Sequence, residues 1–362
     1  MAADSCIKTT ERLLVLKAEL LAPDLLLVIP GGITMGAVPN QIESPISASI
    51  LHAFESSRKH PLARVVDRNV ILRPGGYVIP GYQAISMTVK LGNDFATGFG
   101  EGPVELAETK ATAEAIERLA LNLYCREKGQ SETSNGWAAH LSEDLAVRNA
   151  LFELIERDVA VSVWENGGPF YIIPTSLWPE RLQAWREHQE TRAEYFDLRI
   201  YLSTGTNGAC ITALLMNARQ NFVAGHASCE DLDAAILSAV NECFRAAHQA
   251  VRLHWFTEVL ALHAEKDTGS LISPGAHSLA YAYHKKTPAE VRFEALSDEQ
   301  ILGLWSEHQA LALSLSRGRL DVDLFEFGPH IVARVTSPRF SPMIWGRKGG
   351  DKRPNKSPHF VG

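Results

Sequence analysis

Cysteine is scarce in this sequence, and the few cysteines are not spaced as metal ligands. The chain has five, none of them in a CxxC pair: Cys6, Cys125, Cys210, Cys229 and Cys243. An odd, scattered set argues against a disulfide framework and against a structural zinc site. We therefore expect reduced thiols and a cytoplasmic protein.

Long hydrophobic runs are also missing. The longest apolar stretch near the start of the chain, residues 20–30, is interrupted by Pro23 and Asp24. It is too short to span a bilayer. Asp4 and Glu11 precede it, where a signal peptide would have a basic start. The sequence predicts no membrane partner.

Several motifs of known chemistry are absent. The sequence contains no GxxxxGK[ST] phosphate loop, no HExxH metal motif, no GxSxG elbow and no dinucleotide-binding fingerprint. Any nucleotide would have to be held by carboxylate-bound metal ions and by Arg or Lys. Lys and Arg total 35 against 42 Asp and Glu, a net charge of −7, which predicts no nucleic-acid partner.

The composition and the hydrophobic pattern predict a folded α+β chain. Of its 362 residues, 46% are hydrophobic, enough for a sizeable core. Three long segments free of glycine and proline have apolar residues at helical spacing: 104–127, 142–165 and 230–264. Short apolar runs predict strands at 64–66, 70–72, 170–173, 198–202, 209–216, 221–224 and 330–335.

A loose repeat links the three predicted helices. A glycine-bearing turn precedes each helix, and each helix carries carboxylates, some of them one turn from a cation. Such pairs have two interpretations. They are either ion pairs on a solvated helix face, or parts of a buried acidic cluster that needs counter-charges or metal ions. Oxygen-only clusters suit Mg²⁺ with a polyphosphate.

Four segments resemble the YcaO family. They are AETKATAEAIERLAL (107–121), SNGWAAHLSEDLAVRNALFELIERDVA (134–160), GHASCEDLDAAILSAVNECFRAA (225–247) and the closing run 323–341, which ends in HIVARVTSPRFS. The second segment, with its SNG start and ELIERD core, is the most specific. The resemblance covers residues 44–342 in order. It implies a YcaO-type α+β fold of strand–turn–helix units around a central polar pocket.

The resemblance also implies an activity. Most YcaO proteins bind ATP and Mg²⁺ and activate a backbone amide of a ribosomally made peptide by phosphorylating its oxygen. The products are azolines, thioamides or amidines. Stand-alone members usually work in complexes with a leader-peptide-binding subunit, and often with a flavin-dependent dehydrogenase that holds FMN.

Five residues match the family's nucleotide and metal motifs. Glu114 and Glu117 match the two carboxylates of the first motif, Glu153 and Arg157 match the end of the second, and Glu242 matches the third. If Mg²⁺ is bound, the four glutamates are the expected ligands, and Arg157 contacts phosphate.

Four other motif positions are changed. Lys110 stands where the family has Ser, Leu141 replaces Asn, Leu145 replaces Glu, and Arg245 replaces Gln. Cations near a carboxylate cluster can neutralise it in place of Mg²⁺, and leucines remove polar ligands. We therefore favour a degenerate ATP site, with no cofactor in this chain. The opposite case stays open, because Lys110 can instead contact a phosphate and Asn149 can supply a displaced polar ligand.

These observations predict three parts of the chain. They are an N-terminal segment (1–43), a YcaO-like domain (44–345) and a flexible tail (346–362). The expected function is a subunit of a peptide-maturation complex of the bacteriocin type, which presents the precursor peptide to, or complements, a flavin-dependent dehydrogenase. An active ATP- and Mg²⁺-dependent cyclodehydratase is the alternative, and a small-molecule-binding protein unrelated to peptides is a third possibility.

Overall fold

The computed structural model describes residues 54–340, except for 74, 130–131, 167, 190–192, 218–221, 262–291, 317 and 319. All described residues belong to one compact unit, Glu43–Gly362. The predicted N-terminal segment and tail lie outside the described residues, so those boundaries stay predictions. No helix in the described ranges combines the length and the apolar character needed to cross a membrane.

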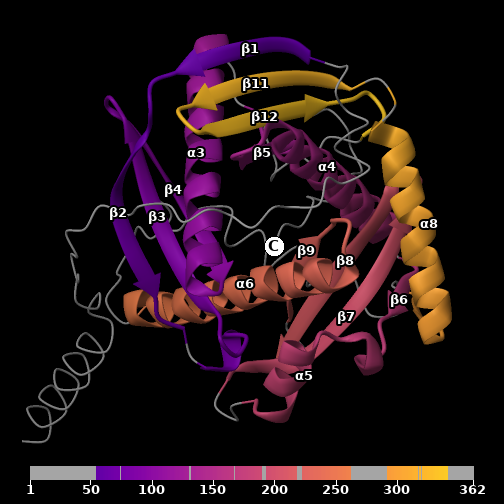
Figure 1. Cartoon of the computed structure of the whole chain (residues 1–362). Coiled ribbons are helices and arrows are strands. Elements are labelled where there is room, and N and C mark those ends of the chain that lie inside the picture. The colour runs from indigo at the N-terminus through magenta and orange to yellow at the C-terminus, as the bar shows by residue number, and fades with distance from the viewer. Residues whose placement is uncertain are drawn as a thin grey trace, which may run out of the picture. The chain divides into compact units, whose positions relative to one another are not determined.

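A three-stranded antiparallel sheet carries the first long helix (Figure 1). Its strands are β2 (Arg64–Ile71), β3 (Gln83–Leu91) and β4 (Asp94–Gly102), and α3 (Val104–Lys128) packs on β4 and β3. Gly98 and Gly100 of β4 lie against the helix, and a Cβ at either position would overlap the backbone of α3. Only glycine permits so close an approach of strand and helix.

The second long helix packs on a four-stranded sheet of order β1–β11–β12–β5. In this sheet β1 is parallel to β11, and the other neighbours are antiparallel. Helix α4 contacts β12 and β5. The bounds are β1 (Phe54–His60), β5 (Trp137–His140), α4 (Glu143–Asn166), β11 (Asp321–Phe327) and β12 (His330–Thr336).

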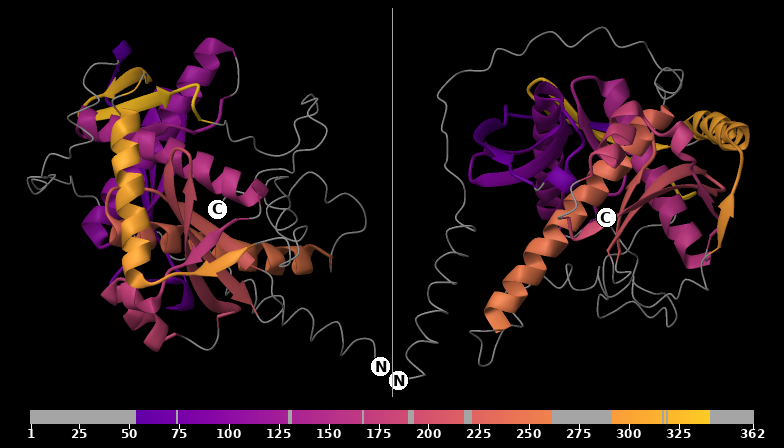
Figure 2. Two further views of the ribbon diagram at one scale, coloured as in Figure 1. Left: turned by 90° about the vertical axis from the view of Figure 1, so that its right-hand side faces the viewer. Right: turned by 90° about the horizontal axis from the view of Figure 1, so that it is seen from below.

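The third long helix packs on a five-stranded sheet of order β10–β6–β7–β8–β9. Helix α6 contacts β9 and β8, and in Figures 1 and 2 it lies between this sheet and the β2–β3–β4 sheet. The bounds are β6 (Phe170–Ile172), β7 (Tyr195–Gly205), β8 (Gly208–Asn217), β9 (Phe222–Ala227), α6 (Leu232–Ala261) and β10 (Phe293–Ala295).

Smaller elements complete the unit. Helix α8 contacts β8, β7 and α4, and the short helix η1 contacts α6. The bounds are η1 (Gly75–Tyr77), η2 (Thr175–Leu177), α5 (Glu180–Glu187) and α8 (Asp298–Ser316).

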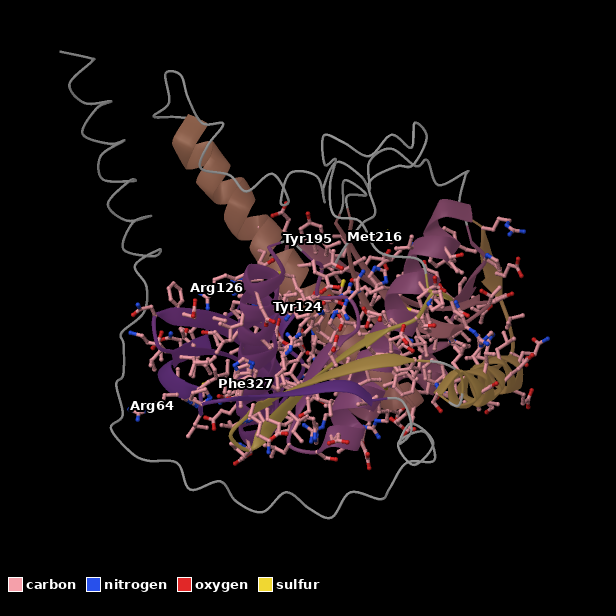
Figure 3. All side chains as sticks on the ribbon, turned by 90° about the horizontal axis from the view of Figure 1, so that it is seen from above. Arg64, Tyr124, Arg126, Tyr195, Met216 and Phe327 are labelled. Carbon is pink, nitrogen blue, oxygen red and sulfur yellow. The ribbon has the colours of Figure 1, made fainter. Side chains whose placement is uncertain are left out.

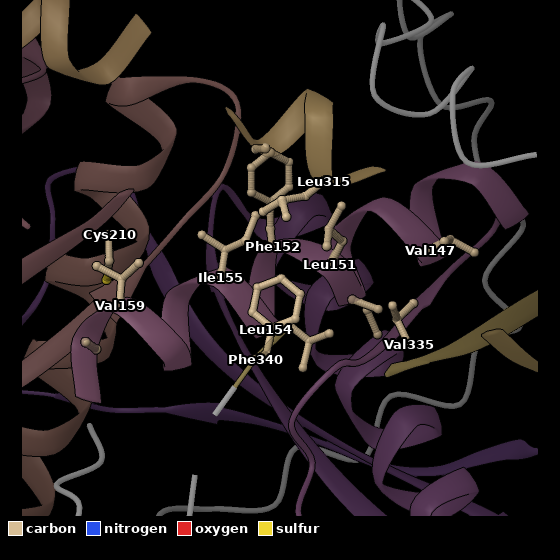
Figure 4. Packing of buried hydrophobic residues seen from close by; sticks show 14 of the residues in the cluster. Val147, Leu151, Phe152, Leu154, Ile155, Val159, Cys210, Leu315, Val335 and Phe340 are labelled. Atoms are coloured by element: carbon tan, nitrogen blue, oxygen red, sulfur yellow. The ribbon is translucent and has the colours of Figure 1, made fainter. Parts of the chain in front are cut away.

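One large apolar cluster surrounds α4 (Figure 4). Leu151 and Ile155 of this helix are fully buried with Val335 of β12, Leu315 of α8 and Phe340. Figure 3 shows side chains filling the space between the elements, with Arg64 at the rim and Tyr124 well inside. Burial of this kind, about 25 cal/mol per Å² of apolar surface, holds α4 between two sheets.

The α+β prediction is confirmed, and so are the predicted helices over the residues described. The structure differs from the prediction in detail. The two strands predicted at 64–66 and 70–72 form the single strand β2, and α8 and the β3–β4 hairpin were not predicted.

Candidate functional site

The same local arrangement recurs on two of the long helices. The backbone N–H of Phe99 in β4 donates to Glu114 Oε2 in α3 at 2.6 Å. The backbone N–H of His226 in β9 donates to Glu242 Oε2 in α6 at 2.7 Å. In both cases the preceding residue is a glycine, Gly98 or Gly225, whose missing side chain lets the helix backbone come close.

Helix α4 carries a related arrangement. The turn residue Gly136 has a positive φ of 73°, which favours glycine. The next residue is Trp137, whose backbone N–H donates to Ser134 O at 3.1 Å. Burial raises the pKa of Glu153, and the nearby Trp137 N–H acts in the opposite direction. The loose repeat in the sequence therefore corresponds to three strand–helix units, two of which have a main-chain N–H that donates to a helix glutamate.

Arg157 is the cation at the centre of the α4 carboxylates. Its Nε lies 3.3 Å from Glu156 Oε1 and 4.0 Å from Glu153 Oε1. Burial raises the pKa of Glu153 and of Glu156 to about 8, although Arg157 acts in the opposite direction. Burial disfavours the charged form of Arg157 too, but Glu156, Glu242 and Glu153 outweigh it and raise its pKa.

Glu242 joins the α4 carboxylates from α6. Its negative charge raises the pKa of both Glu153 and Glu156, which places the three groups within electrostatic range. Arg245, one turn further along α6, has its Nη2 3.8 Å from Glu242 Oε1. Arg245, which the sequence comparison predicts to replace a family Gln, therefore supplies a counter-charge to Glu242.

The α3 carboxylates complete the group. Glu114 also pairs with Arg118 Nη2 at 2.5 Å. Burial, then Glu153 and Glu114, raise the pKa of Glu117 well above its ordinary value. Among the described residues no hydrogen-bond partner reaches the Glu117 carboxyl. We call these five residues, contributed by α3, α4 and α6, the acidic cluster: Glu114, Glu117, Glu153, Glu156 and Glu242.

A second set of charges borders the acidic cluster. Arg73, between β2 and η1, has its Nη2 2.7 Å from Glu101 Oε1 of β4. The negative charge of Glu101 also acts to raise the pKa of Lys110 and of Arg245. Lys110 and Arg245 are therefore within electrostatic range of the carboxylate that pairs with Arg73. We call Arg73, Lys110 and Arg245 the basic group.

The two changed leucines lie where α4 begins. Leu141 lies two residues before α4, Leu145 is in its first turn, and both are half-buried. Neither belongs to an apolar cluster among the described residues. That they fill space beside the acidic cluster, and that the cluster lines a pocket, stay predictions.

Three site residues were not predicted from the sequence. Glu156 lies within the ELIERD signature itself, and its spacing next to Arg157 was the available signal. Arg73 and Glu101 were not predicted, because both lie outside the segments that carry the family resemblance and their pairing across 28 positions depends on tertiary packing.

The side chains of the acidic cluster offer only oxygen ligands, as a magnesium site requires. Mg²⁺ prefers octahedral oxygen ligands at about 2.0–2.1 Å. Within the described ranges, no three His, Cys, Asp or Glu side chains are placed to hold a metal ion. Glu114, Glu153 and Glu242 instead each have an arginine nearby. As they stand, the residues fit mutual charge neutralisation better than they fit metal binding.

The fold and the site define an α+β protein in which three strand–helix units bring buried carboxylates together. The family model described as YcaO cyclodehydratase, ATP- and Mg²⁺-binding, matches residues 120–317, more than half of the chain. The chain belongs to the YcaO family. No curated protein sequence matches it.

Solved structures resemble this chain at low sequence identity. A chain of the Escherichia coli microcin synthetase McbBCD complex is 13% identical with a TM-score of 0.51, over 75% of this chain and 88% of that chain. A chain of the same complex with pro-MccB17 bound is 11% identical with a TM-score of 0.51, over 77% of this chain and 91% of that chain. YcaO from Methanopyrus kandleri bound with AMPPCP and Mg²⁺ is 16% identical with a TM-score of 0.47, over 75% of this chain and 85% of that chain. These likenesses concern the fold.

Proposed function

We propose that this chain is a YcaO subunit in the maturation of a ribosomally synthesised peptide, and that it has lost ordinary Mg²⁺-dependent ATP binding. Membership of the YcaO family supports the class of reaction. The similar fold in a microcin synthetase complex, also seen with pro-MccB17 bound, supports work in a complex on a precursor peptide.

The observation that carries this proposal is the ion pair of Arg245 with Glu242 at 3.8 Å. A guanidinium at this position supplies positive charge where a metal ion would otherwise be needed. Lys110 adds a second positive charge near Glu101. The chain then presents the precursor peptide to, or complements, a flavin-dependent dehydrogenase that holds FMN, and it needs no cofactor of its own.

An active cyclodehydratase is the second candidate, and one observation favours it. Arg157 Nη1 is buried and has no hydrogen-bond acceptor among the described residues. A buried donor without an acceptor is costly, and a phosphate oxygen would satisfy it. In this candidate Glu114, Glu117, Glu153 and Glu242 hold Mg²⁺, which lets ATP activate a backbone amide oxygen of the precursor.

Calorimetric titration and phosphate release separate the two candidates. The full chain, with its partner subunits and the precursor, is titrated with ATP in the presence of Mg²⁺ and again in EDTA. The proposal expects no Mg²⁺-dependent binding and no phosphate release. Micromolar binding that requires Mg²⁺, with phosphate released on addition of precursor, contradicts it and supports the active enzyme.

A reversion variant gives the matched comparison. Lys110→Ser, Leu141→Asn, Leu145→Glu and Arg245→Gln together restore the residues expected of the family. If these four changes caused the loss, the quadruple variant gains Mg²⁺-dependent ATP binding that the natural chain lacks. A natural chain that binds Mg²⁺ and ATP as well as the variant does would show that the changes are neutral.

A further inference from the structure

The edge strand β2 leaves large apolar side chains in solvent. One edge of β2 pairs with β3, and no strand pairs with its other edge in the described part of the chain (Figure 1). Val65, Val66 and Val70 of this strand are 49%, 55% and 44% exposed. Leu62 before the strand and Leu72 after it are exposed as well. An open edge with exposed apolar residues is a place where another extended chain can pair.

One face of this edge continues a buried layer of the sheet. Val65 lies opposite Val89 of β3, and Val70 lies opposite Ile85. Both β3 residues are fully buried and pack with residues of α3. Directly opposed residues of antiparallel strands share a face of the sheet. A further strand beside β2 would therefore place its own apolar side chains next to Val65 and Val70 and extend this layer.

The opposite face carries positive charge without a counter-charge. Arg64 lies directly opposite Lys90 of β3, and both residues are exposed. Two cations opposed across strands repel each other. Neither makes an ion pair with a described residue, whereas Arg68 of the same strand pairs with Glu108 of α3 at 2.6 Å. This face of the edge therefore favours an acidic neighbour.

The sequence around β2 is basic although the whole chain is acidic. Residues 58–73 contain five Lys or Arg and a single Asp, whereas the chain has a net charge of −7. Two copies of this chain joined at β2 would bring two basic edges together, which charge repulsion opposes. The charges therefore favour a different, acidic polypeptide as the occupant.

The edge leads towards the acidic cluster. Arg68 links β2 to Glu108, which lies six residues before Glu114 on α3, or about 9 Å along the helix axis. Arg73 of the basic group follows two residues after the end of β2 and pairs with Glu101 at 2.7 Å. A peptide held along β2 would therefore have one end beside the charged site.

We propose that the edge of β2 binds the precursor peptide as an added β-strand, through a segment that alternates acidic and apolar residues. Main-chain hydrogen bonds give such a complex its affinity, and alternate side chains give it specificity. The apolar side chains cover Val65 and Val70, and the acidic side chains face Arg64 and Lys90. The inference rests on the proposed function, in which the chain presents a precursor peptide.

The probe for the test is a fluorescein-labelled octapeptide of alternating glutamate and valine, matched to the eight residues of β2. Fluorescence anisotropy measures its affinity for the full chain, and hydrogen exchange read by mass spectrometry locates it. We expect binding that weakens with salt, and slower exchange of the β2 amides when the probe is bound. Unlabelled precursor should displace the probe.

Exposed cations supply the variants and the control. Arg64→Glu and Lys90→Glu should each weaken binding about fivefold, because an attraction becomes a repulsion. Arg186→Glu makes the same change of charge on α5 and should leave the affinity unchanged. The double variant Arg64→Glu/Lys90→Glu should bind an octapeptide of alternating lysine and valine better than the natural chain does, a gain that a misfolded variant could not show.

The outcomes separate this inference from the proposed function. No binding of the probe, or binding that leaves the exchange of β2 or the effect of Arg64→Glu and Lys90→Glu unseen, overturns the docking edge and leaves the degenerate subunit standing. A precursor that fails to displace the probe overturns it too, because the occupant is then another polypeptide. A dimer that the probe dissociates makes a second copy the occupant, with the same consequence. ATP binding that requires Mg²⁺ overturns the degenerate site alone and leaves the edge in place.

Discussion

The backbone N–H of His226 donates to the carboxylate of Glu242 at 2.7 Å, although the two residues are 16 positions apart in the chain. The contact exists because Gly225 lets α6 lie directly against β9; a Cβ at this glycine would overlap the α6 backbone at Ala239 O and Cys243 N, on either side of Glu242. The close approach positions Glu242 among the α4 carboxylates.

Replacing Gly225 should push α6 away from β9 and destabilise the fold. We expect Gly225→Ala to lower the free energy of unfolding by about 3 kcal/mol or more, since backbone atoms cannot rearrange as side chains do. Urea unfolding measures the loss. Gly303→Ala is the control, because Gly303 lies within α8 with open space around it. That change should stabilise the chain by about 0.5–1 kcal/mol. Equal effects of the two changes would contradict the packing described.

Arg157 should contribute most to the free energy of unfolding at high pH. Without it, Glu153 and Glu156 lose their nearest cation and can avoid burying charge only by holding protons. We expect Arg157→Met to cost about 3 kcal/mol or more near pH 9, and clearly less near pH 6, where the carboxyls are neutral. Arg118→Met, which removes a more exposed partner of Glu114, should cost about 1 kcal/mol or less. Denaturant unfolding at the two pH values gives both comparisons.

The acidic cluster should make the fold less stable as the pH rises. Burial raises the pKa of Glu153 and of Glu156 to about 8, above the ordinary value of 4.5, so the folded chain binds more protons than the unfolded chain between these values. The stabilisation is complete below the unfolded pKa and is lost as the pH rises through about 8.

The measurement is the free energy of unfolding across this pH range. Glu156→Gln should flatten the fall, because the amide cannot ionise. Glu127→Gln, an exposed carboxylate on α3, should leave the slope unchanged. A natural chain whose stability rises over the same range would show that the cluster is ionised in the folded state.

Glu114 distinguishes a structural from a catalytic cluster. Glu114→Ala removes the acceptor of the Phe99 N–H and should lower the free energy of unfolding by about 1–3 kcal/mol. Glu114→Gln keeps an acceptor and should cost less. In a subunit with a degenerate site, neither variant changes phosphate release, which is absent already. A coupled assay with the precursor present checks this, and a natural chain whose phosphate release is abolished by Glu114→Gln would support the active enzyme.

The long helices could be predicted because the residue pattern that indicates a helix lies within the helix itself. The predicted helices 104–127 and 142–165 match α3 and α4 within one residue at each end, since glycine and proline are absent and apolar residues follow helical spacing. Helix α8 was missed, and it contains Gly303. The parallel pairing of β1 with β11 joins segments more than 250 residues apart, and no local pattern encodes such a pairing.

The sequence by itself determined which residues share a helix face. Spacings of three and four residues placed Glu114 with Glu117, Glu153 with Arg157, and Glu242 with Arg245, because helical geometry repeats every 3.6 residues. The SNG and ELIERD residues of the family signature also predicted the YcaO fold.

Only the tertiary structure decided which faces meet. The pairing of Arg73 with Glu101, and the effect of Glu101 on Lys110 and Arg245, depend on how α3, α6 and their sheets pack. Burial in that packing, rather than spacing along the chain, is also what shifts the pKa of Glu117 and makes the charges of this site depend on one another.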